Sequence, residues 1–234
     1  MCTRFVYRGS DIITGFNFDI DLSAWTHKVM KEKERFYIGI LRPDGVYHSY
    51  HGVNQNGNAG TLLYVHGNSA GAYQDGGNCM TIADLTEQFI KAQISFDEVL
   101  QIVKSKKIVY ASDATMQAML SDAHGRTLVI EPGIGYKEEQ SKYSLITNYS
   151  LMWPESTRDF IVPGDDRYER ALRLLDSCKN EFSVSDAFTL LQTVRQEGAW
   201  ATRVSFVYSV NERTVYYTEN NHFEHIKKFT FPFA

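Results

Sequence analysis

The segments of this sequence that alternate like β-strands come in pairs, and a short run of turn-forming residues joins the two members of each pair. Residues 3–8 and 12–18 flank a Gly-Ser-Asp connection, and residues 36–41 and 46–50 flank an Arg-Pro-Asp-Gly turn. Proline fixes φ and glycine accepts a positive φ, so such runs reverse the chain within a few residues. Two further pairs are residues 116–121 with 127–131 and residues 204–210 with 214–218. Because hairpins pair antiparallel, the sequence predicts mostly antiparallel sheets.

Two pairs of helices separate these blocks of strands. Apolar residues recur every three or four positions in 81–91 and again in 166–178, which is the period of an amphipathic helix. The second helix of each pair begins at a serine cap. Residues 95–98 have the sequence of a capping box, and residues 183–186 cap a helix that reaches about Gln192.

The remaining segments complete a layered arrangement. We expect a strand at 143–147, an edge strand at 223–229, and strand ends with substrate-facing loops in the glycine-rich stretch 52–77 around the apolar run 61–65. The order is then strands, two helices, strands, two helices, strands. With no Pro/Ser-rich linker to divide the chain, this order predicts one layered α+β domain over residues 1–234.

The composition describes an ordinary globular chain. Among 234 residues, 24 are Lys or Arg and 28 are Asp or Glu, so the net charge is 24 − 28 = −4, and 43% are hydrophobic. A nucleic-acid or anionic-membrane binder would need a basic block, which this sequence lacks. No apolar run approaches a membrane span, and the first residues do not resemble a signal peptide, so the expected location is the cytoplasm.

The chain has three cysteines, an odd number that argues against a disulfide framework. We expect Cys79 and Cys178 to be buried structural residues. Cys2 differs, because removal of Met1 would leave it with a thiol and a free α-amine on one carbon. Their reference pKa values are about 8.5 and about 7.7–8.0, so the amine can act as the general base for the thiol. Such a residue is an N-terminal nucleophile.

Motifs elsewhere in the chain accompany Cys2. Cys2-Thr3 opens a strand, the sequence from Gly15 to Asp19 ends the next one, and residues 52–57 and 145–148 follow in order. Together these motifs resemble the choloylglycine hydrolase family, which includes bacterial penicillin V acylases and bile salt hydrolases and is related to acid-ceramidase-type amidases. The resemblance implies a four-layer αββα sandwich of N-terminal-nucleophile hydrolase type. It also implies cleavage of linear, non-peptide C–N amide bonds in an N-acyl amide such as penicillin V or a conjugated bile acid.

The resemblance assigns five site residues and implies neither a metal nor a cofactor. Cys2 matches the nucleophile, and Asp19 matches the carboxylate that holds the ammonium or orients the thiol. Tyr64 lies next to the backbone N–H of the oxyanion hole, and Asn148 matches the asparagine that contacts the α-amine and the oxyanion. Arg167 matches a late active-site arginine. Each of the last four also has an ordinary interpretation. Asp19 could end a strand and Tyr64 could be one of the sheet aromatics. Asn148 could cap a turn, and Arg167 could be a charge in the first turn of a helix.

Two departures from the family affect these expectations. Phe16 stands where the family has an arginine beside the thiol, and such a charge would lower the pKa of a cysteine. We hypothesise that Arg4 replaces it, because residues i and i+2 share one face of a strand. The chain is also shorter and lacks the loop that assembles family tetramers. We therefore expect a monomer or a smaller homo-oligomer, and an open pocket in which Trp25 and Tyr64 suit an apolar or aromatic acyl group.

Three alternatives stay open at this point. The acyl-enzyme could pass its acyl group to an amine, which would make the protein an acyltransferase. The protein could be a catalytically altered relative that binds small molecules, and a purely structural role is the third alternative. A metal site at His48 and His51 is disfavoured, because residues i and i+3 of a strand point to opposite faces.

Overall fold

A six-stranded sheet carries both ends of the chain. The computed structural model describes residues 1–178 and 181–232. All neighbouring strands of this sheet are antiparallel, and the order is β12-β1-β2-β13-β14-β15. The strands are β12 (Tyr143–Ile146), β1 (Thr3–Arg8), β2 (Ile12–Asp19), β13 (Thr202–Ser209), β14 (Thr214–Glu219) and β15 (Lys227–Thr230).

A seven-stranded sheet packs face to face on the first. Its order is β11-β10-β9-β6-β5-β4-β3, again antiparallel throughout. The strands are β11 (Gly135–Glu139), β10 (Thr127–Glu131), β9 (Met116–Ser121), β6 (Ala59–Tyr64), β5 (Tyr47–Asn54), β4 (Arg35–Leu41) and β3 (His27–Glu32). A separate parallel pair is formed by β7 (Cys79–Thr81) and β8 (Lys107–Val109).

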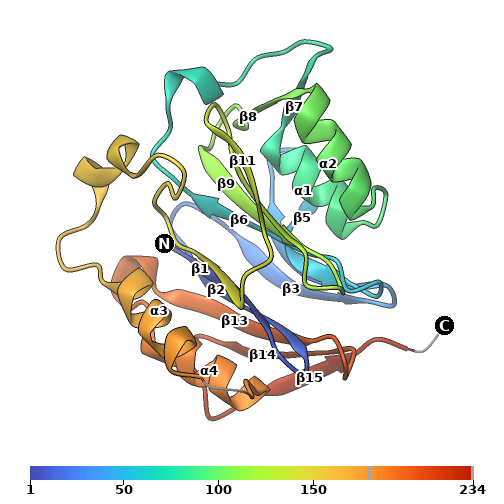
Figure 1. Cartoon of the computed structure of the whole chain (residues 1–234), viewed down its shortest axis with the longest axis vertical. Helices are drawn as coiled ribbons and strands as arrows, with labels where there is room; N and C mark the ends of the chain where they lie inside the picture. Colours follow the sequence, from blue (N-terminus) through green and yellow to red (C-terminus); the bar gives the residue numbers. More distant parts are fainter. Residues whose placement is uncertain (179–180, 233–234) are drawn as a thin grey trace.

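Helices cover the outer face of each sheet, as Figure 1 shows. The helices α1 (Ile82–Ile90) and α2 (Phe96–Ser105) pack on the seven-stranded sheet, and α3 (Arg167–Ser177) and α4 (Val184–Thr193) pack on the six-stranded sheet. The layers are therefore helix, sheet, sheet, helix, and the predicted αββα sandwich is confirmed. Short 3-10 turns are η1 (Ser69–Gly71), η2 (Pro154–Ser156), η3 (Arg158–Phe160) and η4 (Gly198–Trp200).

Three apolar clusters hold the four layers together. The central one lies between the sheets and includes the fully buried rings of Phe16, Phe36 and Phe206. The other two lie between each sheet and its helices. Burial of one such ring contributes about 1.5–3 kcal/mol, so the sandwich interior is the main source of stability.

The predicted hairpins and helices are confirmed to within a few residues. Both capping boxes form, at Ser95 with Glu98 and at Ser183 with Asp186. The sequence reading missed β3, β7, β8 and β11. β3 and β11 are edge strands with polar or charged sequences, so they lack the apolar alternation that marks a strand. The segment predicted at 223–229 is a strand only from Lys227, since turns occupy the preceding residues.

None of the helices in the described part of the chain is both long and apolar enough to span a membrane.

Candidate active site

Cys2 lies at the end of the sandwich where β1 begins and β2 ends. It is buried between the sheets, with 6% of its surface exposed. The register that pairs Thr3 with Asn17 brings Cys2 alongside the end of β2. The backbone N–H of Asp19 lies 3.5 Å from Cys2 Sγ, and the α-ammonium of Met1 donates to the carbonyl of Asp19 at 3.3 Å. The β1–β2 hairpin alone therefore places Asp19 next to Cys2.

The Asp19 carboxylate is buried and only half satisfied. Its Oδ1 accepts a hydrogen bond from Thr202 Oγ1 at 2.6 Å. Its Oδ2 has no hydrogen-bond donor within the described residues and lies 3.7 Å from Arg167 Nη1. Burial raises the pKa of Asp19 to about 6, although the terminal ammonium, Thr202 and Arg167 oppose the rise. One carboxylate oxygen is thus available to a further donor.

Arg167, the first residue of α3, joins the parts of the cluster. Its guanidinium is 1% exposed and donates to the carbonyl of Cys2 at 3.0 Å and to Asn148 Oδ1 at 3.3 Å. Two further bonds, of 2.8 and 2.7 Å, run to the two carboxylate oxygens of Asp165. The interpretation of Arg167 as an ordinary charge in the first turn of a helix does not explain why its side chain is buried against two carboxylates.

Asn148 and Tyr64 complete the group in different ways. Asn148 follows β12 and donates from Nδ2 to the carbonyl of Tyr64 at 2.7 Å. A side-chain amide carries two N–H groups, so the second remains for another acceptor. The side chain of Tyr64 is 50% exposed, and its contact with Asn148 is made by the backbone. The structure therefore brings together four predicted side chains and the backbone of the fifth residue.

The thiol of Cys2 is protonated at neutral pH while Met1 is in place. Burial raises its pKa to about 11. The terminal ammonium and Arg167 lower it, and the charge of Asp19 raises it. Burial outweighs the nearby positive charges, so thiolate formation needs a change at this end of the chain.

Arg4 does not supply the charge that Phe16 lacks. Phe16 is fully buried and stacks on the ring of His51 at 5.2 Å. Arg4 is also buried, but its guanidinium donates to Ser121 Oγ at 3.0 Å and to the carbonyl of Phe5. The charges that act on the pKa of Cys2 are those of the terminal ammonium, Asp19 and Arg167. The hypothesis that Arg4 takes the place of the family arginine is not supported.

Three residues of the cluster were missed by sequence reasoning. Thr202 bonds to Asp19, Asp165 pairs with Arg167, and the hydroxyl of Tyr149 donates to Asp165. Tyr149 and Asp165 are sequence neighbours of Asn148 and Arg167, which was the only available signal. Cys79 and Cys178 are free and partly exposed, so the expectation that they are buried is wrong.

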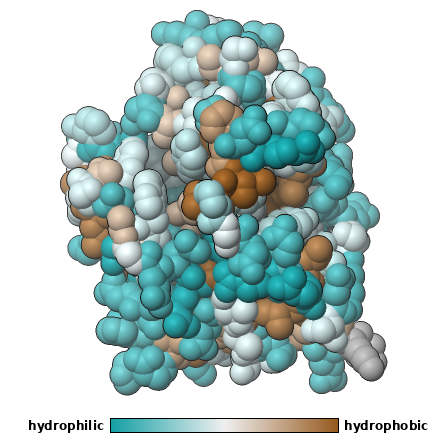
Figure 2. Space-filling model, turned by 90° about the vertical axis from the view of Figure 1, so that its left-hand side faces the viewer, coloured by the Kyte–Doolittle hydropathy of each residue, from teal (hydrophilic) through white to brown (hydrophobic). Residues whose placement is uncertain are grey.

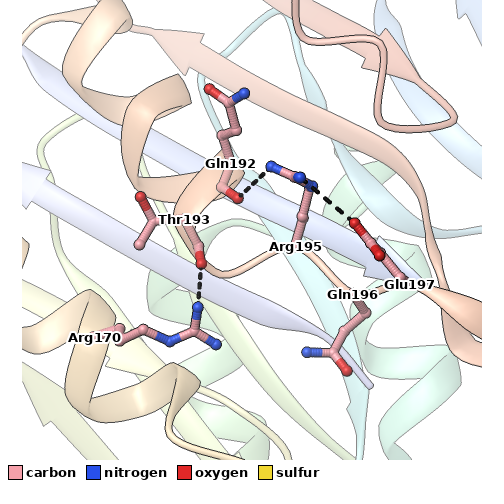
Figure 3. A pocket seen from close by; sticks show the side chains of 6 residues that line it. All are labelled: Arg170, Gln192, Thr193, Arg195, Gln196 and Glu197. Carbon is pink, nitrogen blue, oxygen red and sulfur yellow. Dashed lines mark hydrogen bonds and ion pairs between the residues drawn. The ribbon is translucent and has the colours of Figure 1, made fainter.

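A shallow pocket of about 380 Å³ lies beside the cluster and holds none of its five predicted residues. Figure 3 shows the side chains that line it, which come from α3, from the last residues of α4 and from the segment that follows α4. The backbone N–H of Gln196 in this pocket donates to Thr202 Oγ1 at 2.8 Å, and Thr202 in turn donates to Asp19. The lining residues are Arg170, Gln192, Thr193, Arg195, Gln196 and Glu197.

Neither a protein-family model nor a curated protein matches the sequence. Solved structures do match. A cysteine-to-alanine mutant of conjugated bile acid hydrolase from Clostridium perfringens aligns over 98% of this chain and 92% of its own, with a TM-score of 0.72 and 15% identity. The chain has the choloylglycine hydrolase fold.

Two other proteins with this fold are similar over most of their length. Penicillin V acylase from Agrobacterium tumefaciens aligns over 94% of this chain and 83% of its own, with a TM-score of 0.66 and 17% identity. An ortholog of N-acylethanolamine-hydrolyzing acid amidase from Caenorhabditis elegans aligns over 99% of this chain and 100% of its own, with a TM-score of 0.61 and 13% identity. The sequence therefore predicted this choloylglycine hydrolase fold correctly.

Proposed function

We propose that the protein is an amidase that hydrolyses the linear C–N bond of a small N-acyl amide, with Cys2 as nucleophile. Penicillin V and a conjugated bile acid are representative substrates. The observation that carries the proposal is the bonded cluster at Cys2. Asp19, Asn148 and Arg167 are all buried. Arg167 donates to the Cys2 carbonyl and to Asn148, and it lies within ion-pair distance of Asp19. The similar structures support it, since their names describe enzymes that cleave amides.

Before the protein can react, the residue before Cys2 is removed. The new α-amine belongs to Cys2, whose Sγ lies 3.5 Å from the backbone nitrogen of Asp19, and Asp19 Oδ2 lacks a hydrogen-bond donor within the described residues. The terminal ammonium already donates to the Asp19 carbonyl, so a positive charge is accommodated here. Moving that charge from residue 1 to residue 2 brings it nearer to Sγ. A closer positive charge favours the thiolate, which offsets part of the effect of burial on the thiol pKa.

Acyl transfer then takes place in two steps. The thiol proton moves to the α-amine, and the thiolate attacks the amide carbonyl. The remaining N–H of Asn148 stabilises the oxyanion, and the α-ammonium returns the proton to the leaving amine. Water next attacks the thioester with the amine as base, which releases the acid and restores the thiol. Arg167 positions the cluster through the Cys2 carbonyl and Asn148.

One observation favours a second candidate, a protein that binds small molecules without catalysis. The thiol is buried with a pKa raised to about 11, and the side chain at Phe16 is uncharged. An acyltransferase would use the same acyl-enzyme and differ only in passing the acyl group to an amine instead of water.

Intact mass, one variant of Cys2 and one control variant test the proposal. The purified protein is weighed and then incubated with a panel of N-acyl amides, with release of acid and amine followed by chromatography. We expect a mass without Met1, hydrolysis by the wild type, no hydrolysis by Cys2→Ala, and unchanged hydrolysis by the control Cys79→Ala. Hydrolysis that persists in Cys2→Ala would contradict the assignment. Binding without turnover by a protein that lacks Met1 would favour the second candidate.

A further inference from the structure

His51 lies on the inner face of β5, across the sandwich from the strand that carries Cys2. It is 5% exposed, and its ring stacks on Phe16 at 5.2 Å and lies 4.9 Å from the ring of Phe18. Phe16 and Phe18 belong to the same buried cluster between the sheets as Cys2, which directly precedes β1. His51 therefore packs on two rings of the cluster that contains the nucleophile.

The hydrogen-bond pattern fixes where the His51 ring carries its hydrogen. Nδ1 accepts a bond from the backbone N–H of Leu62 at 3.2 Å, so in the neutral ring the hydrogen is on Nε2. Burial lowers the pKa of His51 to about 3, which keeps the ring neutral in any ordinary buffer. Within residues 1–178 and 181–232, no acceptor bonds to Nε2. This atom is not completely buried, so its hydrogen can bond to an acceptor from outside the protein, and the rings beside it are apolar.

The neighbouring histidine shows the contrast. His48 lies on the opposite face of the same strand, and both of its ring nitrogens are bonded, Nδ1 to Glu87 at 2.8 Å and Nε2 to Asp44 at 2.9 Å. His48 is therefore a satisfied structural residue. His51 keeps one donor that none of the described residues accepts.

We infer that His51 Nε2–H binds a neutral acceptor oxygen, such as an ether or ketone, in the acyl part of the substrate. Phe16 and Phe18 supply an aromatic wall beside that oxygen. The inference rests on the proposed amidase function and adds to it a substrate class, acyl groups that carry an uncharged oxygen beyond the scissile carbonyl. Figure 2 shows the molecule from the left-hand side of Figure 1, where the surface is mostly hydrophilic and apolar residues gather near the centre and at one edge.

Matched pairs of amides test this inference. The two members of a pair have the same chromogenic amine and the same chain length. In one member, an ether oxygen replaces a methylene several carbons from the carbonyl. The position of this oxygen differs from pair to pair. For one position we expect wild-type kcat/KM to favour the ether by about tenfold, as one hydrogen bond would. His51→Phe keeps the stack on Phe16 and should lose the preference. His51→Gln, which retains a terminal N–H, should recover part of it.

Binding of the same pairs to Cys2→Ala, measured by calorimetry, separates this inference from the proposed function. A preference for the ether in binding, without any turnover by the wild type, would support the role of His51 and refute the amidase. Turnover without a preference at any position would refute the role of His51 and leave the amidase in place. No binding of either member would overturn the inference. The comparisons of turnover by the wild type and of binding to Cys2→Ala can be made even where His51→Phe fails to fold. If His51→Phe folds and still prefers the ether, the role of His51 is contradicted.

Discussion

Replacing Asp19 with asparagine should stabilise the protein at neutral pH while abolishing hydrolysis. Burial raises the pKa of this carboxyl group from 3.8 to about 6. Below pH 3.8 the group is protonated in both the folded and the unfolded chain. Between 3.8 and 6 the unfolded chain loses the proton first, so the stability of the folded state falls as the pH rises. Above pH 6 the carboxylate is ionised in both states, and the folded state has lost all of the unfolding free energy that this pKa difference can remove.

The size of this cost follows from the two pKa values. A difference of about 2 pH units, at about 1.4 kcal/mol per unit, gives about 3 kcal/mol. The attraction of Arg167 is already contained in the raised pKa, because the pKa is the net result of burial and neighbouring charges. Asparagine is neutral at every pH and keeps an oxygen that accepts the bond from Thr202 Oγ1. The unfolding free energy of Asp19→Asn should therefore lack the pH-dependent decrease that the Asp19 carboxylate causes in the wild type.

Urea unfolding at several values between about pH 4 and about pH 7 measures the effect. The quantity of interest is the difference in unfolding free energy between Asp19→Asn and the wild type, because other titrating groups cancel in it. We expect this difference to grow by up to about 3 kcal/mol across the range. The control Asp75→Asn makes the same substitution at an exposed carboxylate and serves as the reference for the comparison. Parallel pH profiles for Asp19→Asn and the wild type would refute the reasoning.

Two further substitutions test the cluster around Cys2. Arg167→Met leaves Asp165 and Asp19 buried without their cation, so we expect a loss of about 3–5 kcal/mol in urea unfolding. The exposed Arg173→Met on the same helix should change stability by less than about 0.5 kcal/mol, and equal losses in the two variants would contradict the placement of Arg167. Asn148→Ala removes the proposed oxyanion donor and should lower kcat about 100–1000-fold with a small effect on KM, which steady-state kinetics measure. A change confined to KM would assign Asn148 to substrate binding instead.

The contact between Cys2 and Asp19 could be predicted from the sequence, whereas most of the cluster could not. A short turn between two alternating segments brings the start of β1 to the end of β2, so local pattern is sufficient there. Arg167 meets Cys2 only because α3 packs on the sheet that contains β12 and β1, a contact over 165 residues of chain. No local periodicity records such a contact. Thr202 and Asp165 are polar residues in unremarkable segments, and their partners became visible only in three dimensions.

The uncharged side chain of Phe16 lies beside the candidate site and is not part of the bonded cluster around Cys2. Phe16 points between the sheets, where it stacks on the neutral ring of His51, while Asp19, Asn148 and Arg167 gather around the backbone and thiol of Cys2. With no cation at position 16, the positive charges left to favour the thiolate are the terminal ammonium and Arg167. Arg167 is largely neutralised by Asp165. Activity should therefore depend strongly on the position of the terminal ammonium.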